Sequence, residues 1–296
     1  MRPMRHQTSR ARVIPALVLL VAATSVALAA AVPAMAAPGK PKQIRIQYVK
    51  PANPAHQLIH DELKRARALE RVQTLLAPIR LPRPLLLKVS GCDGEANAWY
   101  DEGEITVCYE YVEEILKIAP EKVPPIGINK HDTVVGPLVD TVLHEFAHAV
   151  FDVLKIPVFG REEDAADLLS AYIMLQFGKS EARRMIIGTA YQYRTDIQDP
   201  KVTLTVKSFS DEHGLPAQRF FNVLCVAYGA DKKMFSDVVE RGFLPKERAE
   251  NCESEYRQVD LAYRKLIKPH VDQKLAKKAV QHWSRIRAVN SPLVPE

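Results

Sequence analysis

The first half of the chain alternates apolar and polar residues in short runs, the pattern of strands with one buried face. The strand-like runs are Ile44–Val49, Leu85–Ser90 and the two arms of a hairpin, Asn97–Tyr100 and Ile105–Tyr109, around the turn Asp101-Glu102-Gly103. Two segments instead repeat apolar residues every three or four positions, and these predict helices over Ala55–Ala77 and Tyr111–Ala119.

The second half has the helical period almost throughout. The predicted helices are Val134–Leu154, Glu162–Phe177, Ala217–Tyr228, Lys232–Arg241, Pro245–Ile267 and Asp272–Ala288. One stretch, Ile187–Leu215, mixes tyrosines, polar turns and the strand-like run Val202–Val206, and we interpret it as a loop or flap. A mixed N-terminal sheet followed by a mainly helical half predicts an α+β fold.

The N-terminus has the three parts of a secretory signal peptide. Four arginines precede the uncharged apolar run Val13–Val32, and the small-residue ending Ala34-Met35-Ala36 follows it, so we predict a signal peptide over residues 1–36. An uncleaved membrane anchor is the alternative for an apolar run of about 20 residues. The alanine content of the run and Pro15 favour cleavage, which predicts a periplasmic or secreted protein with no stable membrane span.

Three further segments follow the predicted signal peptide. Residues 37–43 read as a flexible leader, 44–270 as one domain, and 271–296 as a basic helical tail whose charges form a solvated face. Cleavage would remove four of the 41 basic residues and none of the 35 acidic ones, which leaves a net charge of +2. This near balance argues against a nucleic-acid partner. No feature of the sequence predicts an oligomeric state.

All four cysteines lie beyond the predicted cleavage site. An exported protein with an even number of cysteines favours disulfides over free buried thiols, the alternative interpretation. The shortest sequence separations pair Cys92 with Cys108 and Cys225 with Cys252. Each such bond would close a short loop and contribute about 3 kcal/mol to stability.

The chemistry of the chain centres on His144-Glu145-Phe146-Ala147-His148. On a helix, residues four apart share a face, so both imidazoles can reach one metal ion. Glu145 is rotated by about 100° from His144, which places its carboxylate beside the metal as a general base for an activated water. The surrounding helix is apolar on nearly every side, so these polar groups would be costly to bury without a shared partner.

An acidic cluster, Gly160-Arg161-Glu162-Glu163-Asp164-Ala165-Ala166-Asp167, begins the next predicted helix. Glu163 and Asp167 are four residues apart, so one can bind the metal while the other accepts the free ring N–H of a histidine ligand. Glu162 and Asp164 are the rival third ligands. Two histidines and one carboxylate, with a fourth position for water, form the ligand set of hydrolytic Zn²⁺ sites.

These motifs resemble those of gluzincin-type zinc metallopeptidases, and from about Ile44 to His270 the chain resembles a family of exported bacterial metallopeptidases with HExxH followed by GREEDAAD. The resemblance implies a zincin-like domain with its sheet and helices over the metal helix. It implies His144, His148 and Glu163 as zinc ligands, Glu145 as general base and Asp167 as the partner of a histidine ligand.

The segment beginning Asn97-Ala98 is similar to the edge strand of thermolysin-like enzymes, which pairs with the backbone of the peptide substrate. The alternative is a plain hairpin with Trp99 in the core. The third histidine of metzincins is absent, because Leu154 stands at that position, and the aminopeptidase signature G-x-M-E-N is also absent.

A second donor usually stabilises the oxyanion of the reaction, and His213 is our candidate, with Tyr191 and Tyr193 as alternatives. The sequence thus predicts an exported zinc endopeptidase acting on peptide or protein substrates. One alternative is a zinc amidase acting on cell-wall or small amides. Another is a non-catalytic zinc-binding protein, in which a residue such as His213 closes the fourth position.

Overall fold

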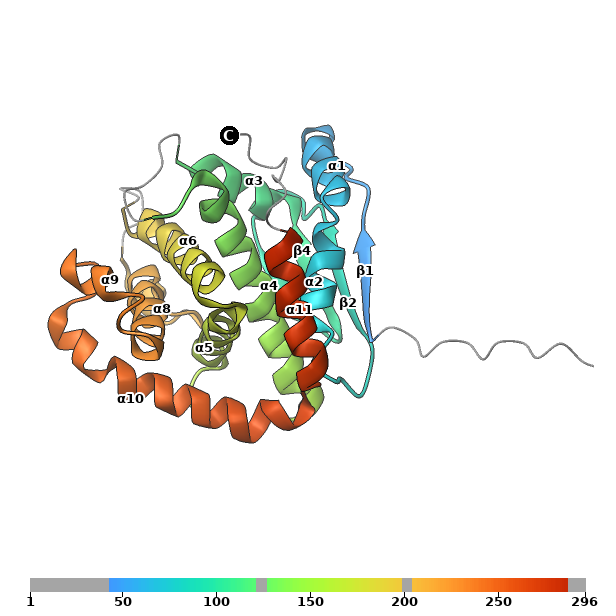
Figure 1. Ribbon diagram of the computed structural model, residues 1–296. Coiled ribbons are helices and arrows are strands. Elements are labelled where there is room, and N and C mark those ends of the chain that lie inside the picture. The colour runs from blue at the N-terminus through green and yellow to red at the C-terminus, as the bar shows by residue number, and fades with distance from the viewer. Residues whose placement is uncertain (1–42, 121–126, 199–203, 287–296) are drawn as a thin grey trace, which may run out of the picture. The chain divides into compact units, whose positions relative to one another are not determined.

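The computed structural model of this chain describes residues 43–120, 127–198 and 204–286 (Figure 1). The predicted signal peptide, most of the predicted leader, residues 121–126, the first part of the strand-like run Val202–Val206 and the end of the predicted tail lie outside the described residues. Every described residue belongs to one compact unit, 42–296. Within it, a small mixed sheet is followed by a predominantly helical half, so the fold is α+β as predicted.

The sheet has four strands in the order β1-β2-β4-β3. They are β1 Ile44–Tyr48, β2 Leu85–Ser90, β3 Ala98–Asp101 and β4 Glu104–Cys108. β1, β2 and β4 run parallel, and β3 pairs antiparallel with β4 through the predicted hairpin, with Ala98 opposite Val107. β3 is therefore an edge strand of the sheet, and it packs against helix α4, Lys130–Leu154.

The first predicted helix is interrupted. A short 3-10 turn η1, Pro54–His56, leads into α1, Gln57–Arg65, and a separate helix α2, Ala68–Leu76, follows. Arg67 adopts a left-handed conformation with a φ of 53°, which ends the helical hydrogen-bonding pattern. The resulting turn allows α2 to pack against β1 and β2. The last helix of this half is α3, Tyr109–Ile118.

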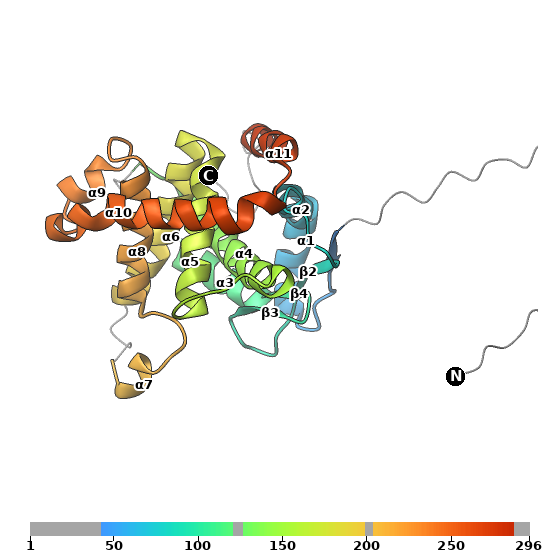
Figure 2. The same cartoon turned by 90° about the horizontal axis from the view of Figure 1, so that it is seen from below.

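The second half is helical after α4. Its elements are α5 Glu162–Met174, η2 Leu175–Phe177, α6 Lys179–Gln198, α7 Val206–Phe209, α8 Pro216–Ala230, α9 Ser236–Glu240, α10 Lys246–Ala262, the π-helical turn η3 Tyr263–Ile267, η4 Lys268–His270 and α11 Gln273–Ile286. Helix α10 runs along the outer side of α5 and α8 (Figures 1 and 2).

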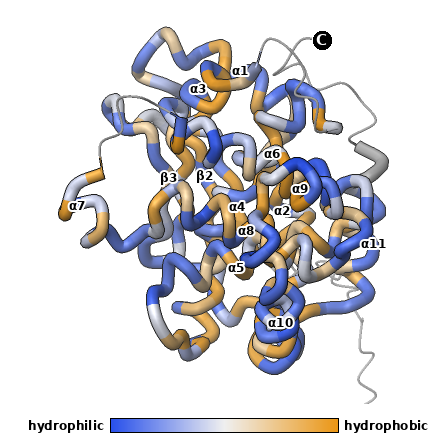
Figure 3. The backbone as a smooth tube through the Cα atoms, turned by 90° about the vertical axis from the view of Figure 1, so that its left-hand side faces the viewer, coloured by the Kyte–Doolittle hydropathy of each residue, from blue (hydrophilic) through white to orange (hydrophobic). Residues whose placement is uncertain are grey.

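The loop or flap predicted over 187–215 is wrong for residues 187–198, because α6 extends to Gln198. Ile187, Ala190 and Tyr193 are buried at helical spacing, and Gly188 packs closely against the backbone of α4. A Cβ at Gly188 would lie 2.1 Å from the carbonyl oxygen of Asp132, so this contact requires glycine. Within the described residues 204–215 of the predicted flap, the short helix α7 is the one regular element, and it projects from its neighbours in Figures 2 and 3.

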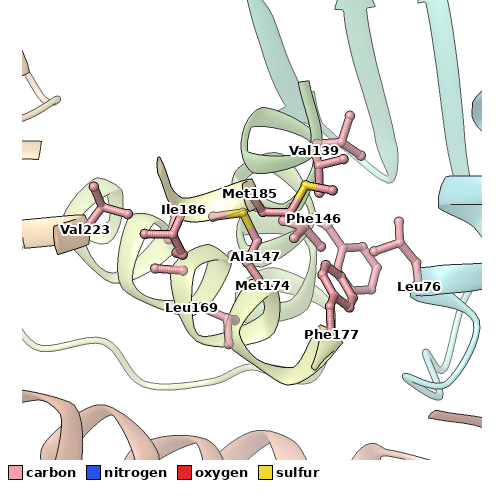
Figure 4. Packing of buried hydrophobic residues seen from close by; sticks show 14 of the residues in the cluster. Leu76, Val139, Phe146, Ala147, Leu169, Met174, Phe177, Met185, Ile186 and Val223 are labelled. Carbon is pink, nitrogen blue, oxygen red and sulfur yellow. The ribbon is translucent and has the colours of Figure 1, made fainter. Parts of the chain in front are cut away.

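Helix α4 lies at the centre of the core. Its Val139, Phe146 and Ala147 pack with residues from α5, α6 and α8 (Figure 4). A capping box fixes its start, since the Asn129 side chain accepts the N–H of Asp132 and the Asp132 carboxylate accepts the N–H of Asn129. The helix is long and apolar enough to cross a membrane, but 78% of its most apolar window is buried within the fold, as expected for a core helix.

The C-terminal helix α11 returns to the N-terminal half and packs against α2 (Figures 1 and 2). Val271 forms an isolated bridge with Ile79, and the Trp283 ring stacks on Phe177 with centroids 5.9 Å apart. The described part of the predicted tail is thus helical and in contact with the rest of the domain. Figure 3 shows α11 as largely hydrophilic.

Two disulfides join Cys92 to Cys108 and Cys225 to Cys252, the pairs with the shortest sequence separation. The first ties the loop before β3 to the end of β4. In the same loop, the Glu110 carboxylate accepts the backbone N–H groups of Cys92 and Gly94. This end of the edge strand is therefore held by a covalent bond and by charge-assisted hydrogen bonds.

Candidate metal centre

Helix α4 supplies His144, Glu145 and His148. His144 and Glu145 are only 4% and 7% exposed, because the core surrounds the helix on most sides. The two imidazoles lie one turn apart on one face, and their Nε2 atoms are 3.1 Å apart. A local helical repeat is sufficient to bring these two ring nitrogens together.

The acid that joins them comes from α5. Lys155 takes a left-handed conformation at the end of α4, with a φ of 53°, and Gly160 has a φ of 99° just before α5. These two positions end the first helix and redirect the chain, so that α5 packs against α4. Glu163 then lies in the first turn of α5, where the helix dipole favours a carboxylate.

The three side chains bring their ligand atoms into one cluster. Glu163 Oε2 lies 2.9 Å from His144 Nε2, Glu163 Oε1 lies 3.4 Å from His148 Nε2, and one ligand atom from each residue lies within 4.8 Å of the others. Ligands about 2.0–2.2 Å from a tetrahedral metal are separated by roughly 3.3–3.6 Å. The observed separations of 2.9, 3.1 and 3.4 Å are slightly shorter than this range or within it, so small side-chain shifts would let the three residues bind one small tetrahedral cation.

The outward-facing ring nitrogens are also occupied. Asp167 Oδ1 lies 2.8 Å from His144 Nδ1, and Glu162 Oε1 lies 2.8 Å from His148 Nδ1. Each carboxylate can accept a proton held on Nδ1, which leaves Nε2 free to bind a metal. Asp164, a rival third ligand in the sequence, forms an ion pair with Arg161 instead.

Glu162 lies outside the ligand cluster, although the sequence makes it a rival third ligand. Its carboxylate lies against Nδ1 of His148, the ring nitrogen that faces away from the cluster. Glu162 precedes Glu163 by one residue, so its side chain is turned by about 100° around α5 from that of Glu163. Sequence alone does not tell which of the adjacent acids faces the ring edge, because that depends on how α5 is rotated against α4.

Arg219 of α8 is a residue that the sequence did not single out. Its Nε and Nη2 atoms donate to the two oxygens of Asp167 at 2.8 and 2.6 Å, and its guanidinium lies over the ring of Tyr193. Behind it, Asp140 accepts hydrogen bonds from Ser170 and Tyr193. This bidentate pair fixes the carboxylate that holds His144. Arg219 is 52 residues from Asp167, so no local pattern could have indicated the contact.

Burial and charge have opposite effects on the polar groups of the centre. Burial alone would lower the pKa of His144, but hydrogen bonds from its ring to Asp167 and Glu163 outweigh burial and raise the pKa to about 10. Burial raises the pKa of Glu145, and the nearby histidines only partly offset this effect. The polar groups of the centre are thus stabilised by hydrogen bonds between imidazoles and carboxylates.

A pocket of about 120 Å³ adjoins the cluster and contains several residues singled out in the sequence. Asn97 and Ala98 of the edge-strand region, His144 and Glu145 of α4, and His213 all line it. These residues come from three distant segments, and the sequence predicts four different roles for them: substrate binding, metal binding, general base and oxyanion stabilisation. Arg219 and Tyr193 line the same pocket, whereas Tyr191 lines a separate apolar cavity.

His213 lies at the exposed side of the centre. Its Nε2 is 2.9 Å from Glu163 Oε2, its Nδ1 is 3.5 Å from Asp211, and half of its side-chain surface is exposed. Its ring stacks on that of His144 with centroids 5.9 Å apart. The rival donor Tyr193 is buried, and its hydroxyl already donates to Asp140. His213 is therefore the better placed of the two to meet a ligand entering from solvent.

Residues 48–267 match the model of a family described as "Putative metallopeptidase". The chain belongs to this family. The matched region contains the whole ligand cluster and every residue that lines the adjoining pocket. No curated protein and no solved structure matches the chain. Membership in this metallopeptidase family indicates, at a coarse level, a peptidase-like hydrolase that uses a metal and acts on peptides.

The residues of the centre fit the metal that the family implies. The His144–His148–Glu163 cluster offers two imidazole nitrogens and a carboxylate, a mixed N/O set typical of transition-metal sites, whereas Mg²⁺ and Ca²⁺ prefer oxygen ligands alone. A second cluster of potential metal ligands is formed by Cys92, Cys108 and Glu110. It has no free thiolate to bind a metal, because the two cysteines form a disulfide.

Proposed function

We propose that this chain is an exported zinc metallopeptidase, a gluzincin-like endopeptidase with a zincin-like domain over 44–270. The observation that carries the proposal is the meeting of His144, His148 and Glu163 next to a buried Glu145. Two histidines and one carboxylate leave a fourth position open, as hydrolytic zinc sites require. Export is supported by the signal-peptide pattern and by the two disulfides, which persist in oxidising compartments.

When bound, zinc would act as a Lewis acid that polarises the scissile carbonyl and makes a nearby water more acidic. The Glu145 carboxylate accepts the proton of the attacking water and then delivers it to the nitrogen of the leaving amine. Asp167, held by Arg219, keeps the proton of His144 on Nδ1.

The extended substrate backbone would lie along β3, whose outer edge offers main-chain hydrogen-bonding groups. β3 pairs with β4 on one side, and Asn97 and Ala98 line the pocket next to Glu145. Main-chain pairing binds a peptide without reading its sequence, so it orients the scissile bond and leaves selection to the side-chain pockets.

Metal removal tests the proposal directly. We expect the mature chain to contain about one zinc per molecule, since three protein ligands define a single site. Dialysis against a chelator should abolish cleavage of a peptide mixture, and stoichiometric Zn²⁺ should restore it. Elemental mass spectrometry and peptide mass spectrometry measure the two quantities. Full hydrolysis by zinc-free protein would contradict the proposal.

The position of His213 favours a second candidate function, a non-catalytic zinc-binding protein. Its Nε2 lies close enough to Glu163 to serve as a fourth ligand after a small side-chain movement, and structural zinc sites are closed in this way. Its exposure and its place in the pocket favour the first function instead, in which it donates a hydrogen bond to the oxyanion.

Replacing His213 with alanine separates the two functions. If His213 stabilises the oxyanion, we expect zinc content to be unchanged and kcat to fall about 10²-fold, the usual cost of one lost donor. His282→Ala, on the exposed surface of α11, is the matched control. Loss of zinc from His213→Ala, with zinc retained in the control, would instead favour the structural site.

A further inference from the structure

The pocket next to Glu145 extends one turn back along α4. Thr141 precedes His144 by three residues, so the two share a helix face and both line the pocket. Tyr111 of α3 and Gln192 of α6 form the facing walls. The Tyr111 hydroxyl is hydrogen-bonded to Thr141 Oγ1 and interacts with the Gln192 side chain. Three helices therefore hold a preformed group of hydroxyls and an amide in the same pocket as His144 and Glu145.

The chemistry of this pocket is polar. Apart from the residues of the metal centre, its lining consists of Asn97, Ala98, Tyr111, Thr141, Gln192 and Tyr193. An apolar side chain covering these groups would remove their water without replacing its hydrogen bonds, which is unfavourable. A mainly apolar lining surrounds a different cavity, between α6, α8 and Phe243, with Arg194 and Asp237 as its charged members.

The charge and the size of the pocket further restrict which substrate side chains it can hold. Arg219 is neutralised by Asp167, and His213 faces the carboxylates of Glu163 and Asp211. Apart from the Glu145 carboxylate at the metal site, the lining thus has no strong bias toward either an acidic or a basic side chain. The pocket volume is about 120 Å³, less than the roughly 150 Å³ of a cavity that holds a benzene molecule, so the pocket favours small side chains over large aromatic ones.

We propose that this pocket is the specificity pocket of the enzyme, and that it selects a small, uncharged, hydrogen-bonding side chain next to the scissile bond. Serine, threonine and asparagine have this chemistry. Thr141 is the specificity-determining residue, because its hydroxyl lies on the same helix face as His144. This inference rests on the proposed peptidase function, and it adds the substrate class.

Profiling cleavage sites tests the inference. The zinc-loaded mature chain is incubated with a proteome-derived peptide library, and the products are identified by mass spectrometry. We expect serine, threonine and asparagine to be enriched at one of the two positions flanking the cleaved bond. For matched peptides with threonine or the isosteric valine at that position, we expect kcat/KM to favour threonine about 10-fold or more.

Thr141 variants link this preference to the pocket. Thr141→Val should reduce the preference for threonine over valine at least about 5-fold, because it removes a hydroxyl and keeps the shape of the side chain. Thr141→Ser keeps the hydroxyl and should keep the preference. Thr195→Val is the matched control, since its hydroxyl bonds to Tyr191 O on the same helix as Gln192 but outside the pocket.

The outcomes separate this inference from the proposed function. Enrichment of leucine or phenylalanine at both flanking positions would overturn the specificity inference and leave the peptidase function intact. An unchanged preference in Thr141→Val would also overturn it. No cleavage of any peptide by the zinc-loaded wild type would overturn the proposed function itself.

Discussion

Glu145→Gln is expected to retain zinc and fold normally while kcat for peptide cleavage falls by about 10²–10⁴-fold, the usual contribution of a general acid–base group. Glutamine has nearly the same shape as glutamate but cannot take a proton from the attacking water. Glu145 is buried beside the two histidines and lines the pocket, so no bulk solvent base can replace it at that position.

The comparison requires three measurements on each protein: zinc content, thermal unfolding and kcat on one peptide. Glu114→Gln, the same substitution at an exposed position of α3, is the matched control and should behave as wild type. Equal kcat for Glu145→Gln and wild type, at equal zinc content, would reject the assigned role. Loss of zinc from Glu145→Gln would show that the carboxylate acts as a ligand instead.

Glu163→Gln is expected to weaken zinc binding more than 100-fold. It replaces an anionic ligand by a neutral amide, whereas loss of a residue that only supports a ligand typically costs 10–100-fold. Asp167→Asn should weaken zinc binding only about 10–100-fold, because Asp167 contacts His144 Nδ1 and no ligand atom of the cluster. Competition with a chelator of known zinc affinity measures both values.

Asp164→Asn is the matched control for this series. Asp164 is adjacent to Glu163 and pairs with Arg161 at the surface, so its substitution should leave zinc affinity unchanged. If Asp164→Asn weakened binding as much as Glu163→Gln, the assignment of the third ligand would be wrong. The order Glu163, then Asp167, then Asp164 is therefore a direct test of the arrangement of α5 against α4.

Many of the strands and helices could be predicted, because their formation depends on the periodicity and turn residues of neighbouring positions in the sequence. β2 has the predicted bounds, and the hairpin of β3 and β4 lies around the predicted turn. The prediction failed where the tertiary context decides. Residues 187–198 form the end of α6, and their tyrosines and polar residues obscured a helix whose buried face is defined by contact with α4 and α8.

The sequence by itself determined the groups that depend on short spacing. His144 and His148 meet because four residues make about one helical turn, and the cysteines join at separations of 16 and 27 residues. Only the tertiary structure decided which acid of the α5 cluster faces the imidazoles and that Arg219 of α8 holds Asp167. These contacts depend on the crossing and rotation of separate helices, which are determined by packing across the whole core and leave no periodic signal in the chain.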